Sequence, residues 1–292
     1  MEGYLYLGLS VLMMVLLFTC LREIPRFRMN LLHVVTTNYF VAAAIGLLFF
    51  APEAFTDVLA VPGASILAIA IGGLFFGLFF LMGITAQKVG VMYMTIVTKM
   101  AVAIPVLFAW LYYSEAMPRL RAAGVLLALG AVLLVNYRPG NPVTLTSSGK
   151  RWMNIMLIAI LFIGSGATDS LFKVFNVHFA KLVPNASFTV ALFAVSAMSG
   201  ALVVGIQLAR HKAKIQGRSL LGGLLMGIPN FFSIIFLTKS LEYFDATVFY
   251  PVNNTLILVA MSLIGLLIYR ERFNPWNLIG LALAVIAVLM LM

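Results

Sequence analysis

The feature that most restricts the fold of this chain is a succession of long apolar runs separated by short polar connections. Many of these runs reach the ~20 residues that an α-helix needs to cross ~30 Å of hydrocarbon. Their apolar residues are continuous rather than alternating, which favours helices over the strands of a membrane barrel. With 63% hydrophobic and 10% charged residues, the composition excludes soluble domains. The sequence therefore predicts an all-α integral membrane protein.

Ten transmembrane helices can be placed along the chain. The predicted spans are 4–21, 31–50, 64–86, 91–113, 120–136, 153–174, 187–208, 220–241, 247–269 and 276–292. A polar connection over 138–151 contains Pro and Gly residues that interrupt helices, and it separates five spans from five. We therefore predict a five-helix segment over 1–137, a connecting loop over 138–151 and a second five-helix segment over 152–292.

Two sequence echoes relate these halves. The Tyr-x-Glu triplet at 113–115 returns at 269–271, an offset of 156, and the Gly-Gly-Leu-x-x-Gly stretch at 72–77 returns at 222–227. Both echoes occur in the same order, which indicates an internal repeat. Because each half has an odd number of spans, the second half must enter the membrane from the opposite side. The prediction is two inverted-topology five-helix repeats.

Repeats of this kind build secondary transporters, with a solute site near the bilayer midplane that opens alternately to each side. The chain has no ATP-binding motif, so a proton gradient or exchange is the expected energy source. The alternative is an intramembrane enzyme acting on a lipid-linked substrate, but His33, His178 and His211 are scattered rather than clustered. A channel-like or structural protein is a third interpretation, against which inverted repeats favour alternating access. We predict a transporter of a small metabolite, not an enzyme, with no cofactor or metal.

The net charge of +10 lies almost wholly in the connections, where Lys and Arg set membrane topology and meet anionic lipid headgroups. Connections after odd-numbered spans hold Arg22, Arg26, Arg28, Lys88, Arg138, Lys150, Arg151, Arg210, Lys212, Lys214, Arg218, Arg270 and Arg272. Those after even-numbered spans hold only Arg119, Arg121 and Lys181. The positive-inside rule therefore predicts that both termini lie outside the cytoplasm. No basic residue precedes the first apolar run, so we expect 4–21 to stay as a span rather than to be removed as a signal peptide.

A further pattern connects the fourth and fifth spans of each half: an apolar run, a Glu, a short polar or Pro turn, and then a Gly-containing helix. It occupies 111–118 before Gly124 and 267–275 before Gly280. With the two five-helix halves, this pattern resembles the drug/metabolite transporter superfamily, specifically the bacterial EamA-type ten-helix transporters. The resemblance covers essentially the whole chain and is most typical over 251–292. In the first half Pro105 lies deeper than the proline usually seen early in the fourth helix.

The resemblance implies a secondary carrier, an exporter or permease, in the bacterial inner (plasma) membrane. It implies a central cavity lined mainly by the first four helices of each half, and it does not specify the solute, the direction, the coupling ion or the oligomeric state. The partners expected are a small-molecule solute, protons and the lipid bilayer, with a homodimer left open and no nucleic acid. Many members of the family are described with cytoplasmic termini; our prediction for this chain follows its charge count.

Four ionisable residues fall within predicted spans. Lys99 is the deepest, with Thr95 one turn before it; it either lines a cavity or neutralises its charge by snorkelling and carbonyl contacts. Asp169 and Lys173 lie one helical turn apart, so they form either a neutralised structural pair or a solute or proton site. Lys239, near a helix end, is favoured as an interface anchor.

The ninth span adds Tyr250 and Asn254 on one face, with Asn253 beside them. Under the offset of 156, Asn254 corresponds to Thr98 and the residue after it corresponds to Lys99. The polar midpoints of the fourth and ninth spans are thus pseudo-equivalent, as expected for a site on the repeat axis. Hydrogen bonding between packed spans is the alternative explanation for these Asn and Thr residues.

Asn230 and Asn38 are weaker candidates on the same reasoning. The predicted solute-binding residues are Lys99, Thr95, Thr98, Asp169, Lys173, Tyr250, Asn253, Asn254, Asn230 and Asn38. The repeated glycine stretches lack the Lys-Ser/Thr of a phosphate loop, so we interpret them as sites of close helix packing. The repeated Glu115 and Glu271 are interpreted as helix-end capping and pairing groups, with proton coupling as the alternative.

Overall fold

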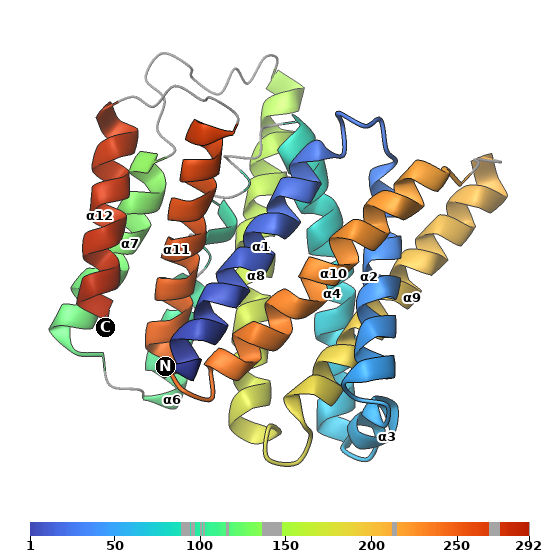
Figure 1. The fold of residues 1–292 in the computed structure, drawn as a ribbon, viewed down its shortest axis with the longest axis horizontal. Coiled ribbons are helices and arrows are strands. Elements are labelled where there is room, and N and C mark those ends of the chain that lie inside the picture. Colours follow the sequence, from blue (N-terminus) through green and yellow to red (C-terminus); the bar gives the residue numbers. More distant parts are fainter. Residues whose placement is uncertain are drawn as a thin grey trace. The chain divides into compact units, whose positions relative to one another are not determined.

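The fold was taken from a computed structural model of residues 1–292, which describes 1–88, 94, 97–99, 101, 103–114, 117–135, 148–211, 215–268 and 275–291. The described elements are helices (Figure 1). They are α1 (Glu2–Glu23), α2 (Leu31–Phe49), α3 (Ala54–Leu59), α4 (Pro62–Lys88), α6 (Ala103–Tyr113), α7 (Arg119–Val135), α8 (Ser148–His178), α9 (Asn185–His211), α10 (Gly217–Ser240), α11 (Ala246–Leu267) and α12 (Pro275–Leu291). The prediction of an all-α protein is confirmed.

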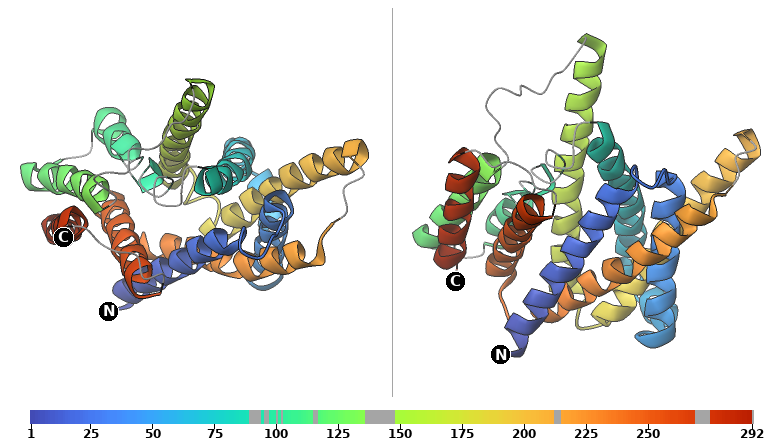
Figure 2. Two further views of the ribbon diagram at one scale, coloured as in Figure 1. Left: turned by 90° about the horizontal axis from the view of Figure 1, so that it is seen from above. Right: turned by 45° about the horizontal axis from the view of Figure 1, so that its top comes forward.

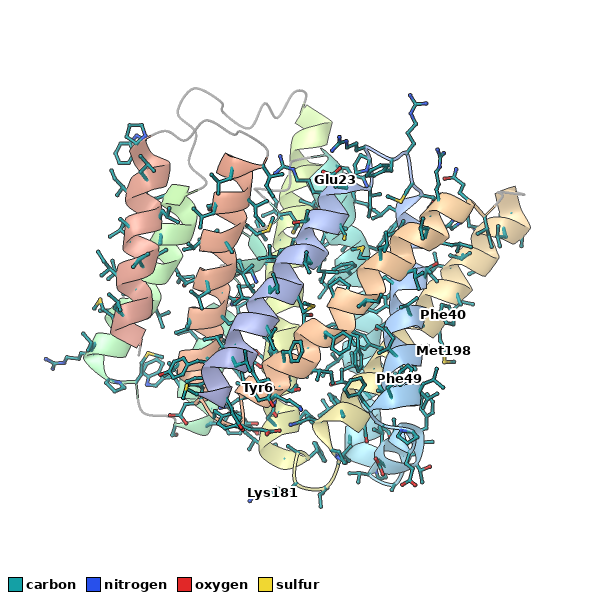
Figure 3. The ribbon with its side chains drawn as sticks, in the orientation of Figure 1. Tyr6, Glu23, Phe40, Phe49, Lys181 and Met198 are labelled. Atoms are coloured by element: carbon teal, nitrogen blue, oxygen red, sulfur yellow. The ribbon has the colours of Figure 1, made fainter. Side chains whose placement is uncertain are left out.

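Six helices in the described part of the chain are long and apolar enough to cross a membrane. These spans are Glu2–Glu23, Leu31–Phe49, Pro62–Thr85, Met156–His178, Asn185–Arg210 and Gly217–Ser240. Shorter apolar helical stretches cover Ala122–Ala131, Val248–Ile264 and Leu278–Ala287. Large apolar side chains also face outward, as Phe40, Phe49 and Met198 do in Figure 3, where they are 49%, 76% and 69% exposed. Such surface is suited to lipid rather than to water.

The predicted span over 91–113 is not one continuous helix. Residues 97–99 are helical, Ala101 lies in a turn, and α6 begins at Ala103. Pro105 explains the interruption, because proline has no N–H to donate to the carbonyl of Ala101 one helical turn earlier. The N–H of Ile104 donates to that carbonyl instead, at 3.0 Å. The regular helix is therefore interrupted at Ala101, two residues after Lys99.

Two other boundaries differ from the prediction. Helix α8 begins at Ser148, inside the polar connection predicted over 138–151. The six-residue helix α3 occupies a connection in which no helix was expected. Helix α6 ends at Tyr113 because Ser114 has a positive φ of 52°, a left-handed conformation that stops a helix.

The described chain packs as two compact units that each combine distant segments. Unit 1 comprises Met1–Leu7, Ile84–Ser170 and Ser240–Met292, and unit 2 comprises Gly8–Gly83 and Leu171–Lys239. In unit 1, α7, α11 and α12 lie side by side in all views (Figures 1 and 2). In unit 2, α2 packs along α9, which also covers α3.

Glycines allow α10 to approach α2 closely within unit 2. A Cβ on Gly223 would stand 2.4 Å from the Cβ of Thr37 and 2.7 Å from the carbonyl oxygen of Val34. One turn later, a Cβ on Gly227 would stand 2.6 Å from the Cβ of Val41. The interpretation of the second glycine stretch as a packing surface is confirmed.

The first copy of the stretch is used differently. Gly72 packs against α9, whose Ser196 hydroxyl donates to the Gly72 carbonyl at 2.8 Å. A Cβ on Gly73 or Gly77 would meet no described atom within 4 Å. The packing interpretation therefore holds for Gly72 but not for the other two glycines of this copy.

Candidate functional site

The candidate site lies in unit 1 and is centred on Lys99. The helical stretch 97–99 holds it just before the interruption at Ala101, and its side chain is only 6% exposed. The neighbouring Thr98 donates its hydroxyl to the carbonyl of Met94 in its own helix, at 3.0 Å. A lysine buried among apolar helices needs compensating polar partners, because a charge in hydrocarbon is costly.

Helix α11 supplies such a partner. The Lys99 ammonium Nζ donates to the amide oxygen Oδ1 of Asn254 at 2.8 Å, a short distance typical of a charge-assisted hydrogen bond. The two residues are 155 positions apart in the chain. The structure thus joins the pseudo-equivalent midpoints of the fourth and ninth predicted spans, as the repeat alignment indicated.

Helix α8 adds the opposite charge. Asp169 and Lys99 are close enough for each charge to act on the other. Asp169 also acts electrostatically on the phenol of Tyr250, which lies one turn before Asn254 on α11. Lys99, Asp169, Asn254 and Tyr250 thus form one cluster, which we call the Lys99 cluster. One cation and one anion offset each other in it, and the amide and phenol supply uncharged hydrogen-bonding groups.

Asn253, next to Asn254, is 2% exposed, and its amide oxygen has no hydrogen-bond partner among the described residues. Lys173 lies one turn beyond Asp169 on α8, after the end of unit 1 at Ser170. The sequence spacing predicted Lys173 as the partner of Asp169. In the structure, the charge of Lys99 acts on Asp169 as well. Thr95 lies outside the described residues.

Asn38 and Asn230 lie in unit 2, where the structure brings them to each other. The Asn230 amide nitrogen donates to the Asn38 amide oxygen at 3.1 Å, and the two side chains are 0% and 6% exposed. This bond joins α2 to α10 beside the close contact at Gly227. Interhelical hydrogen bonding, the alternative explanation for these residues, accounts for the geometry.

Sequence reasoning overlooked Thr85, a fully buried residue of unit 1 near the end of α4. Its hydroxyl has no hydrogen-bond partner among the described residues. A single Thr in an apolar span carries no periodic signal, so only the burial in the structure identifies it. Glu115, Tyr269 and Glu271, the repeated residues of the Tyr-x-Glu echo, lie outside the described residues.

Three comparisons bear on this arrangement. The profile of the EamA-like transporter family matches residues 156–292. A protein of Haemophilus influenzae, named only as uncharacterized, is 24% identical over 260 residues, which cover 87% of this chain and 86% of that protein. A solved crystal structure has the same fold with a TM-score of 0.71 at 15% identity, over 99% of this chain and 95% of that one.

The six long apolar helices and the family match indicate a multi-pass membrane protein. Over residues 156–292 the chain is similar to the EamA-like transporter family of the drug/metabolite transporter superfamily. This similarity suggests transmembrane transport, and the family is generally non-enzymatic.

Proposed function

We propose that the protein is a secondary transporter of a small polar metabolite and that the Lys99 cluster binds the solute. The observation that carries the proposal is the 2.8 Å bond between Lys99 Nζ and Asn254 Oδ1. It joins the polar midpoints of the fourth and ninth predicted spans, which are one residue apart in the alignment of the two sequence halves. Inverted-repeat transporters place their solute sites at such a position.

The proposal includes ten membrane spans arranged as two inverted five-helix repeats in the bacterial inner membrane. Alternating access would then expose the Lys99 cluster first to one side and then to the other. The internal echo at an offset of 156 and the match of the second half to the family profile support this arrangement. Asp169 is the group we assign to proton coupling, because a carboxyl beside a lysine can exchange its proton as the solute binds.

The transport proposal predicts release driven by a pH gradient. Proteoliposomes containing the purified protein are loaded with an isotope-labelled bacterial metabolite extract, and the solutes released are identified by mass spectrometry. We expect at least one polar metabolite to leave faster from these vesicles than from protein-free vesicles. Release that persists without a pH gradient but requires the same solute outside would indicate exchange, whereas no protein-dependent release of any metabolite would contradict transport.

The role of Asn254 gives a matched pair of variants for the same assay. Asn254→Leu removes the acceptor of the Lys99 bond without changing any charge, and we expect transport to fall by about 10–150-fold, the equivalent of a charge-assisted hydrogen bond of about 1.5–3 kcal/mol. Asn176→Leu is the control, since the Asn176 amide donates to the carbonyl of Phe172 in its own helix. Equal rates for the two variants would remove Asn254 from the site.

Orientation is tested separately. The distribution of Lys and Arg predicts that both termini lie outside the cytoplasm. A reporter that is active only in the periplasm, fused after Met292, is therefore expected to be active, and a reporter that fluoresces only in the cytoplasm is expected to be dark. The opposite result would show that the charge asymmetry does not set the topology of this chain.

A further inference from the structure

A second buried polar site lies in unit 2, where it shares no residue with the Lys99 cluster. His33, in the first turn of α2, is 3% exposed, and neither ring nitrogen has a hydrogen-bond partner among the described residues. Its backbone is well held, because its N–H donates to the side chain of Asn30, the residue that caps α2, at 3.2 Å. The imidazole is therefore buried without a hydrogen-bond partner among the described residues.

A second polar side chain near His33 is also buried without a hydrogen-bond partner among the described residues. Thr36, one turn further along α2, is 7% exposed, and its hydroxyl has no partner in the described part of the chain. Helix α9 approaches this hydroxyl closely through Gly200, because Thr36 Oγ1 lies only 2.7 Å from where a Cβ on Gly200 would stand. A larger residue than glycine at that position would displace the hydroxyl.

A third unpaired group comes from α9 itself. Gly46 of α2 contacts Val190, while Thr36 faces Gly200, so the two helices run in opposite directions. Residues of α9 after Gly200 therefore lie toward the beginning of α2. Gln207 lies there, and its amide oxygen is buried without a hydrogen-bond partner among the described residues.

We propose that the junction of α2 and α9 is a water-binding site, centred on His33 and Thr36 and completed by Gln207. Buried polar groups are almost always hydrogen-bonded to protein or to ordered water, and here the described protein supplies no partner. A neutral imidazole offers one donor and one acceptor, a hydroxyl offers both, and an amide oxygen accepts, which suits a water molecule that makes about three hydrogen bonds. Water is the ligand that satisfies donors and acceptors together without adding charge to this interior.

The sign of a stability change tests the proposal. If the Thr36 hydroxyl is truly unpaired, Thr36→Val removes an unsatisfied polar group and raises the melting temperature; if it binds water, the same change lowers it. We expect a fall of about 2–4 °C, measured as thermal unfolding in detergent. Thr189→Val is the reference for losing a satisfied hydroxyl, because Thr189 is 1% exposed and donates to the carbonyl of Asn185 at 2.8 Å. A rise for Thr36→Val overturns the site.

Direct detection of the water follows from the small number of histidines. The chain has three, so selective 15N-histidine labelling gives few ring signals, and the signal of His33 is the one lost in His33→Gln. We expect the His33 ring nitrogens to show the shifts of a hydrogen-bonded neutral imidazole and an exchange cross-peak with water. A His33 ring without hydrogen bonds and without contact to water would overturn the proposal even if no Thr36 variant could be purified.

Discussion

Replacing Lys99 by methionine is expected to destabilise the protein and abolish transport, whereas adding Asp169→Asn restores stability without restoring transport. Lys99 is 6% exposed, and its charge offsets that of Asp169. Removing one member of a buried ion pair costs about 3–5 kcal/mol because the other charge remains without compensation. Replacing both by uncharged groups of similar size removes that cost. Transport stays absent in the double variant because both charged groups of the proposed solute site are gone.

The measurement is the melting temperature in detergent together with transport in proteoliposomes. We expect a fall of roughly 5–15 °C for Lys99→Met and a return to within a few degrees of the original value for the double variant. Lys239→Met is the matched control, since Lys239 lies exposed near the end of α10. A double variant no more stable than Lys99→Met would show that the two charges do not act as a pair.

The second large effect concerns the repeated glycines. Gly223→Ala is expected to be strongly destabilising, whereas Gly73→Ala, at the matching position of the first copy, is expected to be neutral or stabilising. A methyl group on Gly223 would press on the backbone oxygen of Val34, which cannot move without shifting α2. Such overpacking costs about 1–3 kcal/mol, while Gly→Ala in an unhindered helix gains up to about 1 kcal/mol.

The measurement is the melting temperature of Gly223→Ala and of Gly73→Ala, compared under the same conditions. Because both changes are chemically identical and occur in the same motif, their difference isolates the helix contact. Equal melting temperatures would mean that α10 and α2 do not approach as closely as described. A severe effect of Gly73→Ala would mean that this face of α4 is covered by something that the described contacts do not include.

The positions of the long helices could be predicted from the sequence because continuous apolar runs have few other solutions in a bilayer. Helix α2, predicted over 31–50 and observed over Leu31–Phe49, is an example. The interruption after Lys99 was not predicted. Pro105 was noticed, but hydropathy cannot distinguish a proline that a helix tolerates from one that breaks it. Helix α3 was not predicted because six residues of mixed polarity carry no periodic signal.

For the site, the internal alignment proved more informative than local spacing. An offset of 156 selected Lys99 and Asn254, and the structure brings them within hydrogen-bond distance. Spacing along one helix predicted Lys173 as the partner of Asp169. It could not identify Lys99, because residue periodicity carries no information on how different helices pack. Burial without a partner, the property that distinguishes His33, Thr36 and Asn253, is visible only once the helices are packed.

The break after Lys99 also sets the depth of the charge in the bilayer. Helix α6 has 11 residues, a length of about 16 Å, and its far end carries the exposed aromatic side chains of Trp110 and Tyr112, which suit the membrane interface. Lys99, just before the other end of α6, would then lie about halfway through ~30 Å of hydrocarbon. A charge at that depth senses about half of the membrane voltage, or about 1.2 kcal/mol per 100 mV. Because Asp169 offsets Lys99 while it is ionised, the empty site then carries no net charge through this field, and the voltage dependence of the proposed transport cycle would be set by the charge of the solute and of the coupled proton.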